Sequence, residues 1–197
     1  MGKALGGARI APTVAGVTLA AITLALALAL ALSGCVSADP AVTPQPQASA
    51  TPLFASDAEA LKAAEEAYAA YLKVSDQITS RGAATPDSIE PYVTKAQLAK
   101  EIQGFQTVSS RKLHTSGMTR FDNSQLKQYS SSPTTRVSLY LCSDATDVRL
   151  MDEAGFDVTP DSRIDRQAFE VDFISASMTK STLVLSRSEP WSGTDIC

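Results

Sequence analysis

Few residues in this chain belong to the types that carry out chemistry, and the three cysteines and the single histidine come first. Cys35, Cys142 and Cys197 can form thioethers, disulfides or metal bonds, and His114 has a side chain suited to acid–base work near neutral pH. One histidine and no C-x-x-C spacing argue against a metal site. No acid lies next to His114, and the sequence has no G-x-S-x-G elbow and no phosphate- or dinucleotide-binding loop. We therefore expect no catalytic residue and no cofactor.

Cys35 lies at the end of an apolar segment. Lys3 and Arg9 precede a run of mostly Ala and Leu over residues 14–32, and no acidic residue occurs before Cys35. A basic start, an apolar stretch and small residues at its end are typical of a secretory signal peptide. The run is close to the roughly 20 residues of a membrane-spanning helix, so an uncleaved anchor is the alternative.

The four residues 32–35, Leu-Ser-Gly-Cys, resemble the bacterial lipobox. In that family the cysteine thiol receives diacylglycerol, cleavage makes the cysteine the new N-terminus, and a further acyl chain such as palmitate can be added. Two acyl chains are enough for stable attachment to a bilayer. The resemblance implies a signal peptide over residues 1–34 and a protein held on the extracytoplasmic face of the cell membrane through acylated Cys35. Without an Arg-Arg pair, general secretion is the expected route.

Lipidation of Cys35 would leave two cysteines in an oxidising compartment. An even number of cysteines in an exported protein favours a disulfide, so we predict a Cys142–Cys197 bond. Two free thiols or a metal pair are the alternatives.

Charge narrows the classes of partner. Two of the 17 basic residues and none of the 21 acidic residues precede Cys35, which leaves a formal charge of −6 on residues 35–197. A net negative charge disfavours nucleic acid as a partner. The expected partners are the lipid bilayer, through Cys35, and a protein or small-molecule ligand.

After Cys35, the composition predicts a tether followed by helices. Residues 35–54 are rich in Ala, Pro, Ser and Thr and lack a pattern that could form a core, so residues 55–197 are expected to form the domain. Ser56 with Glu59, and Thr94 with Gln97, form capping-box patterns that predict two helices, with a short helical turn between them. Apolar residues at helical spacing in the first helix include Tyr68 and Tyr71, which line either a core or a pocket.

Beyond residue 113 the apolar period changes to two, which indicates half-buried antiparallel strands. Val137, Leu139 and Leu141 alternate with polar residues, and Phe169, Val171 and Phe173 alternate with Glu170 and Asp172. The segments expected to be strands are residues 114–121, 135–142, 147–151, 167–175 and 182–187.

Helices followed by strands indicate an α+β domain, with N-terminal helices packed on a curved antiparallel sheet. This order resembles the nuclear transport factor 2-like (cystatin-like) cone fold. The two downstream cysteines and Trp191 make the chain similar to small secreted lipoproteins of Gram-positive actinobacteria. The resemblance implies a cell-surface protein with a non-enzymatic binding or envelope-associated role. The alternative is a small cone-fold enzyme of the isomerase or cyclase type, with Glu170, Asp172 or His114 as acid or base.

Overall fold

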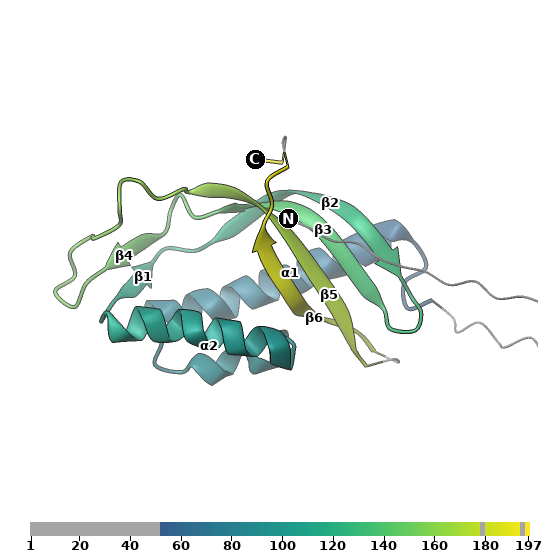
Figure 1. Ribbon diagram of the computed structural model, residues 1–197, viewed down its shortest axis with the longest axis horizontal. Coiled ribbons are helices and arrows are strands. Elements are labelled where there is room, and N and C mark those ends of the chain that lie inside the picture. Colours follow the sequence, from purple (N-terminus) through teal and green to yellow (C-terminus); the bar gives the residue numbers. More distant parts are fainter. Residues whose placement is uncertain (1–51, 178–179, 194–195) are drawn as a thin grey trace, which may run out of the picture. The chain divides into compact units, whose positions relative to one another are not determined.

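The computed structural model describes residues 52–177, 180–193 and 196–197 (Figure 1). The predicted signal peptide, Cys35 and the tether as far as residue 51 lie outside this range. No helix among the described residues has the length and apolar character to cross a bilayer. The α+β class is confirmed. The elements are α1 (Asp57–Ser80), the 3₁₀ helix η1 (Pro86–Tyr92), α2 (Lys95–Ser110), β1 (His114–Ser116), β2 (Arg120–Ser130), β3 (Arg136–Asp144), β4 (Arg149–Met151), β5 (Arg166–Ser177) and β6 (Lys180–Pro190).

Both long helices begin where the capping boxes predict. The Ser56 hydroxyl accepts a hydrogen bond from the Glu59 amide at 3.2 Å, and the Thr94 hydroxyl accepts one from the Gln97 amide at 3.3 Å. The Glu59 carboxylate accepts from the Ala55 amide at 2.9 Å, one residue before the cap. These bonds satisfy amides that have no partner within the helix, which is why each helix starts at that residue.

Four strands form the main antiparallel sheet, in the order β2-β3-β5-β6, and β1 pairs with β4 in a separate two-stranded sheet. The main sheet curves over α1, and α2 lies beside α1 on the same side (Figure 1). The alternating apolar residues of β3 and β5 face the helices, as predicted. The core between sheet and helices includes Ala60, Ala64, Tyr68, Ile78, Ile89, Phe105, Val137, Leu139, Leu141, Val171, Phe173 and Leu185.

Phe54 belongs to this core, although we expected it in the tether. Its side chain is 7% exposed, and its ring lies 5.8 Å from that of Tyr129 on β2. The Tyr129 hydroxyl accepts from the Phe54 amide and donates to the Phe54 carbonyl, both at 3.0 Å. The packed domain therefore begins before residue 55. The sequence could not indicate this, because one aromatic residue after a Pro/Ala-rich stretch has no periodicity.

The strand expected over residues 114–121 is two strands, and most of β2 was not predicted. β1 ends at Ser116 because Gly117 follows with φ +95°. β2 then runs to Ser130, well beyond the predicted end. Its pairing with β3 shifts register twice, between residues 122 and 125 and between residues 126 and 128, and each shift interrupts the alternation on which the prediction depended.

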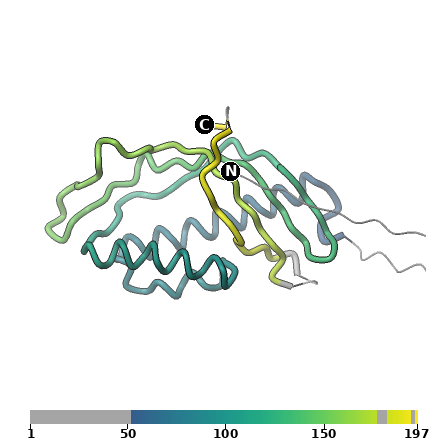
Figure 2. Tube along the Cα trace, viewed as in Figure 1, coloured from purple at the N-terminus to yellow at the C-terminus, as the bar shows by residue number. Residues whose placement is uncertain are grey.

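Ile196 and Cys197 are held to the main sheet by two bonds. Cys142 alternates with the inward-facing Leu141 and forms the predicted disulfide with Cys197, with a Cα–Cα distance of 5.1 Å. The Asn123 side chain on β2 donates to the Ile196 carbonyl at 2.9 Å. These two bonds join the end of the chain, marked C in Figure 2, to the β2–β3 part of the sheet.

Trp191 is a packed aromatic residue. Its ring stacks on that of Tyr140 with centroids 4.1 Å apart. A Cβ atom on Gly193 would lie 1.9 Å from the Trp191 ring, so the chain passes close to it. Trp191 is thus held by Tyr140 and by its own C-terminal segment and is not an open binding platform.

Candidate functional site

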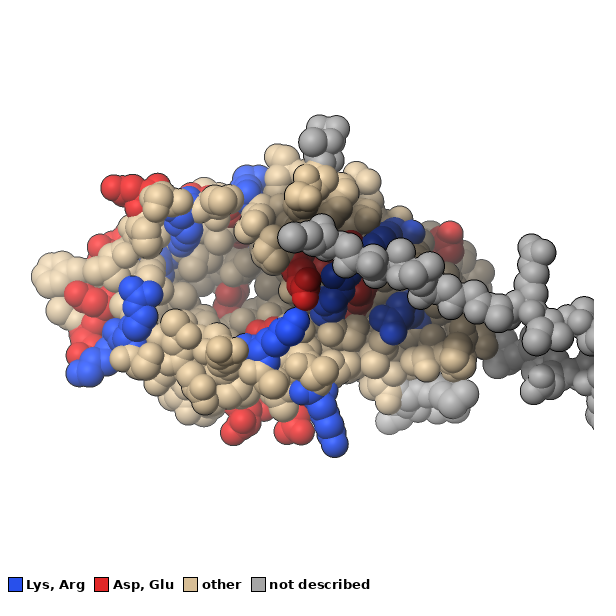
Figure 3. All heavy atoms as spheres, in the orientation of Figure 1, with Lys and Arg blue, Asp and Glu red and all other residues tan. Residues whose placement is uncertain are grey.

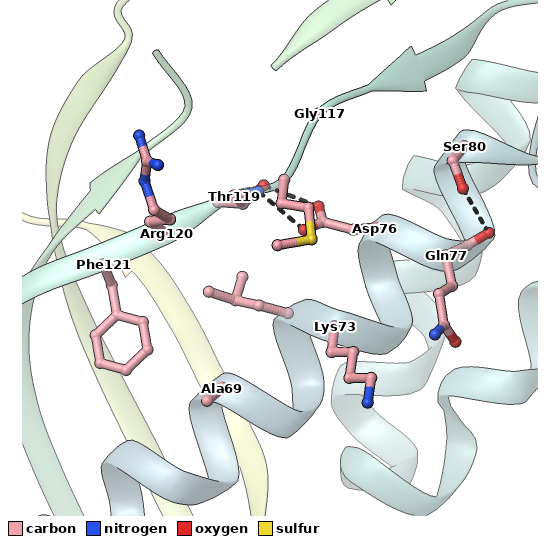
Figure 4. Close-up of a pocket in the computed structure, with 11 residues that line it drawn as sticks. Ala69, Lys73, Asp76, Gln77, Ser80, Gly117, Thr119, Arg120 and Phe121 are labelled. Atoms are coloured by element: carbon pink, nitrogen blue, oxygen red, sulfur yellow. Dashed lines mark hydrogen bonds between the residues drawn. The ribbon is translucent and has the colours of Figure 1, made fainter. Parts of the chain in front are cut away.

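A pocket of about 520 Å³ lies where the C-terminal half of α1 meets the chain between β1 and β2 (Figure 4). Its volume is within the range of small-molecule sites. We call it the α1–β2 pocket. It is lined by Ala69, Leu72, Lys73, Asp76, Gln77, Ser80, Gly117, Met118, Thr119, Arg120 and Phe121.

The spacing of the helical residues explains one wall of the pocket. Ala69, Leu72 and Asp76 are three and four residues apart in turn and therefore lie along one side of α1, with Lys73 next to Leu72. The other wall is the segment that includes Met118 and the beginning of β2. In Figure 4 the apolar side chains of the two walls face each other across the pocket.

Asp76 and Thr119 join the two walls. One carboxylate oxygen of Asp76 accepts from the Thr119 amide at 2.8 Å, and the other accepts from the Thr119 hydroxyl at 2.9 Å (Figure 4). Burial raises the pKa of the Asp76 carboxyl above its ordinary value, and the two Thr119 hydrogen bonds offset part of that rise. Because both oxygens are engaged, Asp76 is a structural clamp at the end of the pocket.

The raised pKa of Asp76 predicts a pH effect on stability. The folded state holds this proton more tightly than the unfolded state, so the stabilising contribution is complete below the unfolded pKa of about 3.9. It is lost as the pH rises through the higher folded pKa. Between about pH 7 and pH 4, the free energy of unfolding of the wild type should therefore rise relative to Asp76→Asn, as measured by urea titrations at each pH. A constant difference between the two proteins would contradict this prediction.

Two cations lie at the rim of the pocket. Lys73 extends from α1 and Arg120 from β2, on opposite sides of the apolar side chains (Figure 4). Arg120 forms an ion pair with Asp147, whereas Lys73 has no ion pair among the described residues. The pocket thus combines an apolar floor with a basic rim.

His114 lies elsewhere, at the beginning of β1 as predicted, and lines a shallow polar hollow with Ser80, Lys112 and Glu153. Glu153 forms an ion pair with Lys112 at 3.0 Å. The structure does not bring His114 together with Glu170 or Asp172, which belong to β5 in the main sheet. The three residues of the alternative enzyme hypothesis therefore do not form one site.

We expect His114→Ala to change the free energy of unfolding by no more than about 0.5 kcal/mol, because the side chain has no hydrogen bond within the described residues. Chemical denaturation of both proteins measures this. If an enzymatic activity is found, His114→Ala should leave its turnover within a factor of two, and a hundredfold loss at unchanged circular dichroism would refute a passive role.

Glu170 and Asp172 face away from the core and are largely buried in ion pairs, so they are neither inside the cone nor freely solvated. Arg187 on β6 forms ion pairs with both carboxylates, at 2.7 Å in the case of Asp172, and Lys127 pairs with Glu170 at 2.8 Å. In Figure 3 acidic and basic side chains lie together in the middle of the molecule. Burial alone would raise the pKa of Asp172, but hydrogen bonds from Ser138 and Arg187 lower it below its ordinary value.

Tyr68 and Tyr71 have different surroundings. Tyr68 is 3% exposed and packs edge-on against Phe121 and Phe173, and burial raises its pKa to about 12 despite hydrogen bonds with Ser143 and Ser188. Tyr68 is therefore a core residue.

Burial, followed by the charge of Glu101 on α2, raises the pKa of Tyr71. Glu101 also accepts from the Gln97 side chain at 2.8 Å. The sequence reasoning missed this tyrosine–acid pair. The four-residue spacing of Gln97 and Glu101 indicates that those two side chains meet, but no sequence pattern indicates that Glu101 lies near Tyr71 on α1.

Within the described residues, no group of three or more His, Cys, Asp or Glu side chains could hold a metal ion.

No family model matches this sequence, and no curated protein matches it. Among solved structures, the intermembrane-space region of the chloroplast protein ARC6 is similar, with a TM-score of 0.47 and 10% identity over 66% of this chain and 95% of that one. A periplasmic fragment of TraM gives a TM-score of 0.45 and 13% identity over 70% of this chain and 98% of that one. CagV, a VirB8 homologue from Helicobacter pylori, gives a TM-score of 0.36 and 10% identity over 66% of this chain and 96% of that one. Likenesses at these scores carry no assignment of function.

Proposed function

We propose that this protein is an extracytoplasmic lipoprotein whose domain binds an apolar ligand in the α1–β2 pocket and catalyses no reaction. The observation that carries the proposal is the pocket itself, a space of about 520 Å³ with apolar walls from two elements. Its walls are joined by the Asp76–Thr119 hydrogen bonds, so the pocket is already formed before a ligand enters.

The disulfide supports an extracytoplasmic address. Cys142 is fully buried and bonded to Cys197, and such structural disulfides persist in oxidising compartments but are rare in the cytosol. A signal peptide ending at the lipobox-like residues 32–35 is consistent with the same address. The disulfide is an observation from the structure and the motif is one from the sequence, so each supports the extracytoplasmic address separately.

The pocket lining supports binding in place of catalysis. It contains no histidine and no cysteine, and both oxygens of its single carboxylate accept hydrogen bonds from Thr119. Histidine and carboxylates are the groups that most often act as general bases, and the lining offers no histidine and no carboxylate without hydrogen bonds. The apolar side chains of the lining, such as Leu72, Met118 and Phe121, are suited to holding an apolar ligand.

Binding can be tested with Nile red, a neutral apolar dye that fluoresces in apolar surroundings. The test would use residues 36–197, because the core described above lies within residues 53–197. The protein would be exported to an oxidising compartment so that the disulfide forms. The dye should bind saturably, and Ala69→Phe, which fills the pocket, should weaken binding at least tenfold. Lys62→Phe, on an exposed part of α1 outside the pocket, is the matched control and should leave binding unchanged. Equal dye binding by wild type and Ala69→Phe would refute the proposal.

Membrane attachment should depend on one atom, the sulfur of Cys35. We expect Cys35→Ser to remove the protein from the processed membrane fraction and to place it in the soluble or unprocessed pool, because serine cannot form the diacylglyceryl thioether. Phase partitioning in Triton X-114, followed by mass measurement of the N-terminus, tests this. Ser33→Ala keeps a small residue in the motif and is the control. Unchanged detergent partitioning of normally processed Cys35→Ser would show that lipid is not attached there.

The tyrosine–acid pair favours one second candidate function, an isomerase. Tyr71 would donate a hydrogen bond to a substrate carbonyl and Glu101 would move a proton, since the charge of Glu101 already acts on the Tyr71 hydroxyl. A spectrophotometric screen of enolisable ketones tests this. Turnover that Glu101→Gln lowers at least a hundredfold, and that Lys62→Gln leaves unchanged, would replace the binding proposal; no turnover above the uncatalysed rate would exclude the isomerase.

A further inference from the structure

We propose that the ligand of the α1–β2 pocket is a single-chain amphiphile with an anionic head, the chemistry shared by fatty acids and negatively charged lysophospholipids. This inference rests on the proposed function and names the ligand class. Three features of the pocket carry it: the apolar floor, the engaged carboxylate and the basic rim.

The floor suits a hydrocarbon chain. Leu72 comes from α1 and Phe121 from β2, and both are half-buried, while Met118 on the connecting segment is 69% exposed. Unbranched, polarisable methionine adapts its shape to a flexible chain. Each methylene buried on such a surface improves affinity about fourfold.

The charges at the pocket favour an anionic head over a cationic one. Asp76 is the only acid in the lining, and its two oxygens accept hydrogen bonds from Thr119 at 2.8 and 2.9 Å, so the two cations of the lining outnumber its acids. Lys73 is exposed and has no ion pair in the described part of the chain. Arg120 shares its charge with Asp147 and can donate to a second acceptor. An anionic head beside Lys73 would pair with a cation that has no other ion pair among the described residues, while its chain covers the floor.

The position of the pocket in the chain agrees with a membrane source for this ligand. Sixteen residues, 36–51, separate Cys35 from the described domain, and they span at most roughly 55 Å when fully extended. A lipid attached to Cys35 would therefore keep the pocket close to a bilayer from which single-chain lipids exchange.

The test uses residues 36–197 and cis-parinaric acid, a fluorescent fatty acid. We expect saturable binding with a dissociation constant on the order of 1 μM. Lys73→Glu should weaken it at least threefold while leaving Nile red binding unchanged. Lys62→Glu reverses a charge on the same helix outside the pocket and is the matched control. Met118→Asp, at an exposed position that does not endanger the fold, should weaken both probes at least threefold.

Competition then identifies the head group. Oleic acid or lysophosphatidic acid should displace parinaric acid at least tenfold more effectively than methyl oleate does, and the stronger of the two acids indicates the source. Equal displacement by methyl oleate, or equal effects of Lys73→Glu and Lys62→Glu, would overturn the anionic class while the apolar pocket stands. Absence of saturable binding of both parinaric acid and Nile red would overturn the ligand class and the proposed function together.

Discussion

Replacing both Cys142 and Cys197 with alanine should lower the free energy of unfolding by about 4 kcal/mol. The bond joins residues 55 positions apart, and in the chain-entropy model a loop of this length restricts the unfolded chain by that amount. The bond also holds Ile196, which is 3% exposed, against the sheet, so its loss should release the C-terminal segment. Urea denaturation of the two proteins measures the difference.

Two controls separate the bond from the side chains. The wild type unfolded in the presence of a reductant should show a similar loss, because the cysteines are then present without the bond. Asn123→Ala removes only the side-chain hydrogen bond to the Ile196 carbonyl and should cost about 1 kcal/mol. A loss below about 1 kcal/mol in the double alanine variant would mean that the bond contributes little to the stability of the domain.

Gly117→Ala should lower the free energy of unfolding by about 3 kcal/mol. Gly117 has φ +95°, and an added Cβ would lie 2.1 Å from the carbonyl oxygen of Asp147. That oxygen belongs to the backbone, so it cannot rotate away as a flexible side chain would. The backbone between β1 and β2 must shift, and with it the wall of the α1–β2 pocket, so Nile red binding should weaken as well.

Two other glycines separate the cost of the positive φ from the cost of the close contact with Asp147. Gly155 has φ +82° with nothing within 4 Å of an added Cβ, so Gly155→Ala should cost only the backbone strain, about 1–2 kcal/mol. Gly104 lies within α2 with equally open surroundings, and Gly104→Ala should stabilise the protein by about 0.5–1 kcal/mol. Thermal and urea unfolding of all three variants measure the order of their changes in the free energy of unfolding. Equal losses for Gly117→Ala and Gly155→Ala would show that the close approach to Asp147 costs nothing.

Local patterns were enough to predict several elements. Ser56 and Thr94 marked the starts of α1 and α2, because a capping bond is made within three residues of the cap. The alternation of Val137, Leu139 and Leu141 identified the buried face of β3, because one strand on one core needs no other information. The cysteine count predicted the disulfide that the structure contains, because with Cys35 assigned to lipid only Cys142 and Cys197 remained to pair.

The remaining features depended on contacts that no local pattern records. β2 was missed because its bulges interrupt the two-residue period, and Phe54 was missed because its partner, Tyr129, lies 75 residues away. Glu170 was placed on a polar face correctly, but its burial comes from Arg187 and Lys127 on two other strands.

The sequence by itself determined the expected address, the class of fold and the ends of the helices, because each depends on residues close together in the chain. Only the tertiary structure decided the candidate site. Asp76 and Thr119 are 43 residues apart and meet because the main sheet curves over α1. A pocket between two elements is the space that their side chains leave unfilled, and that space exists only after both elements have packed.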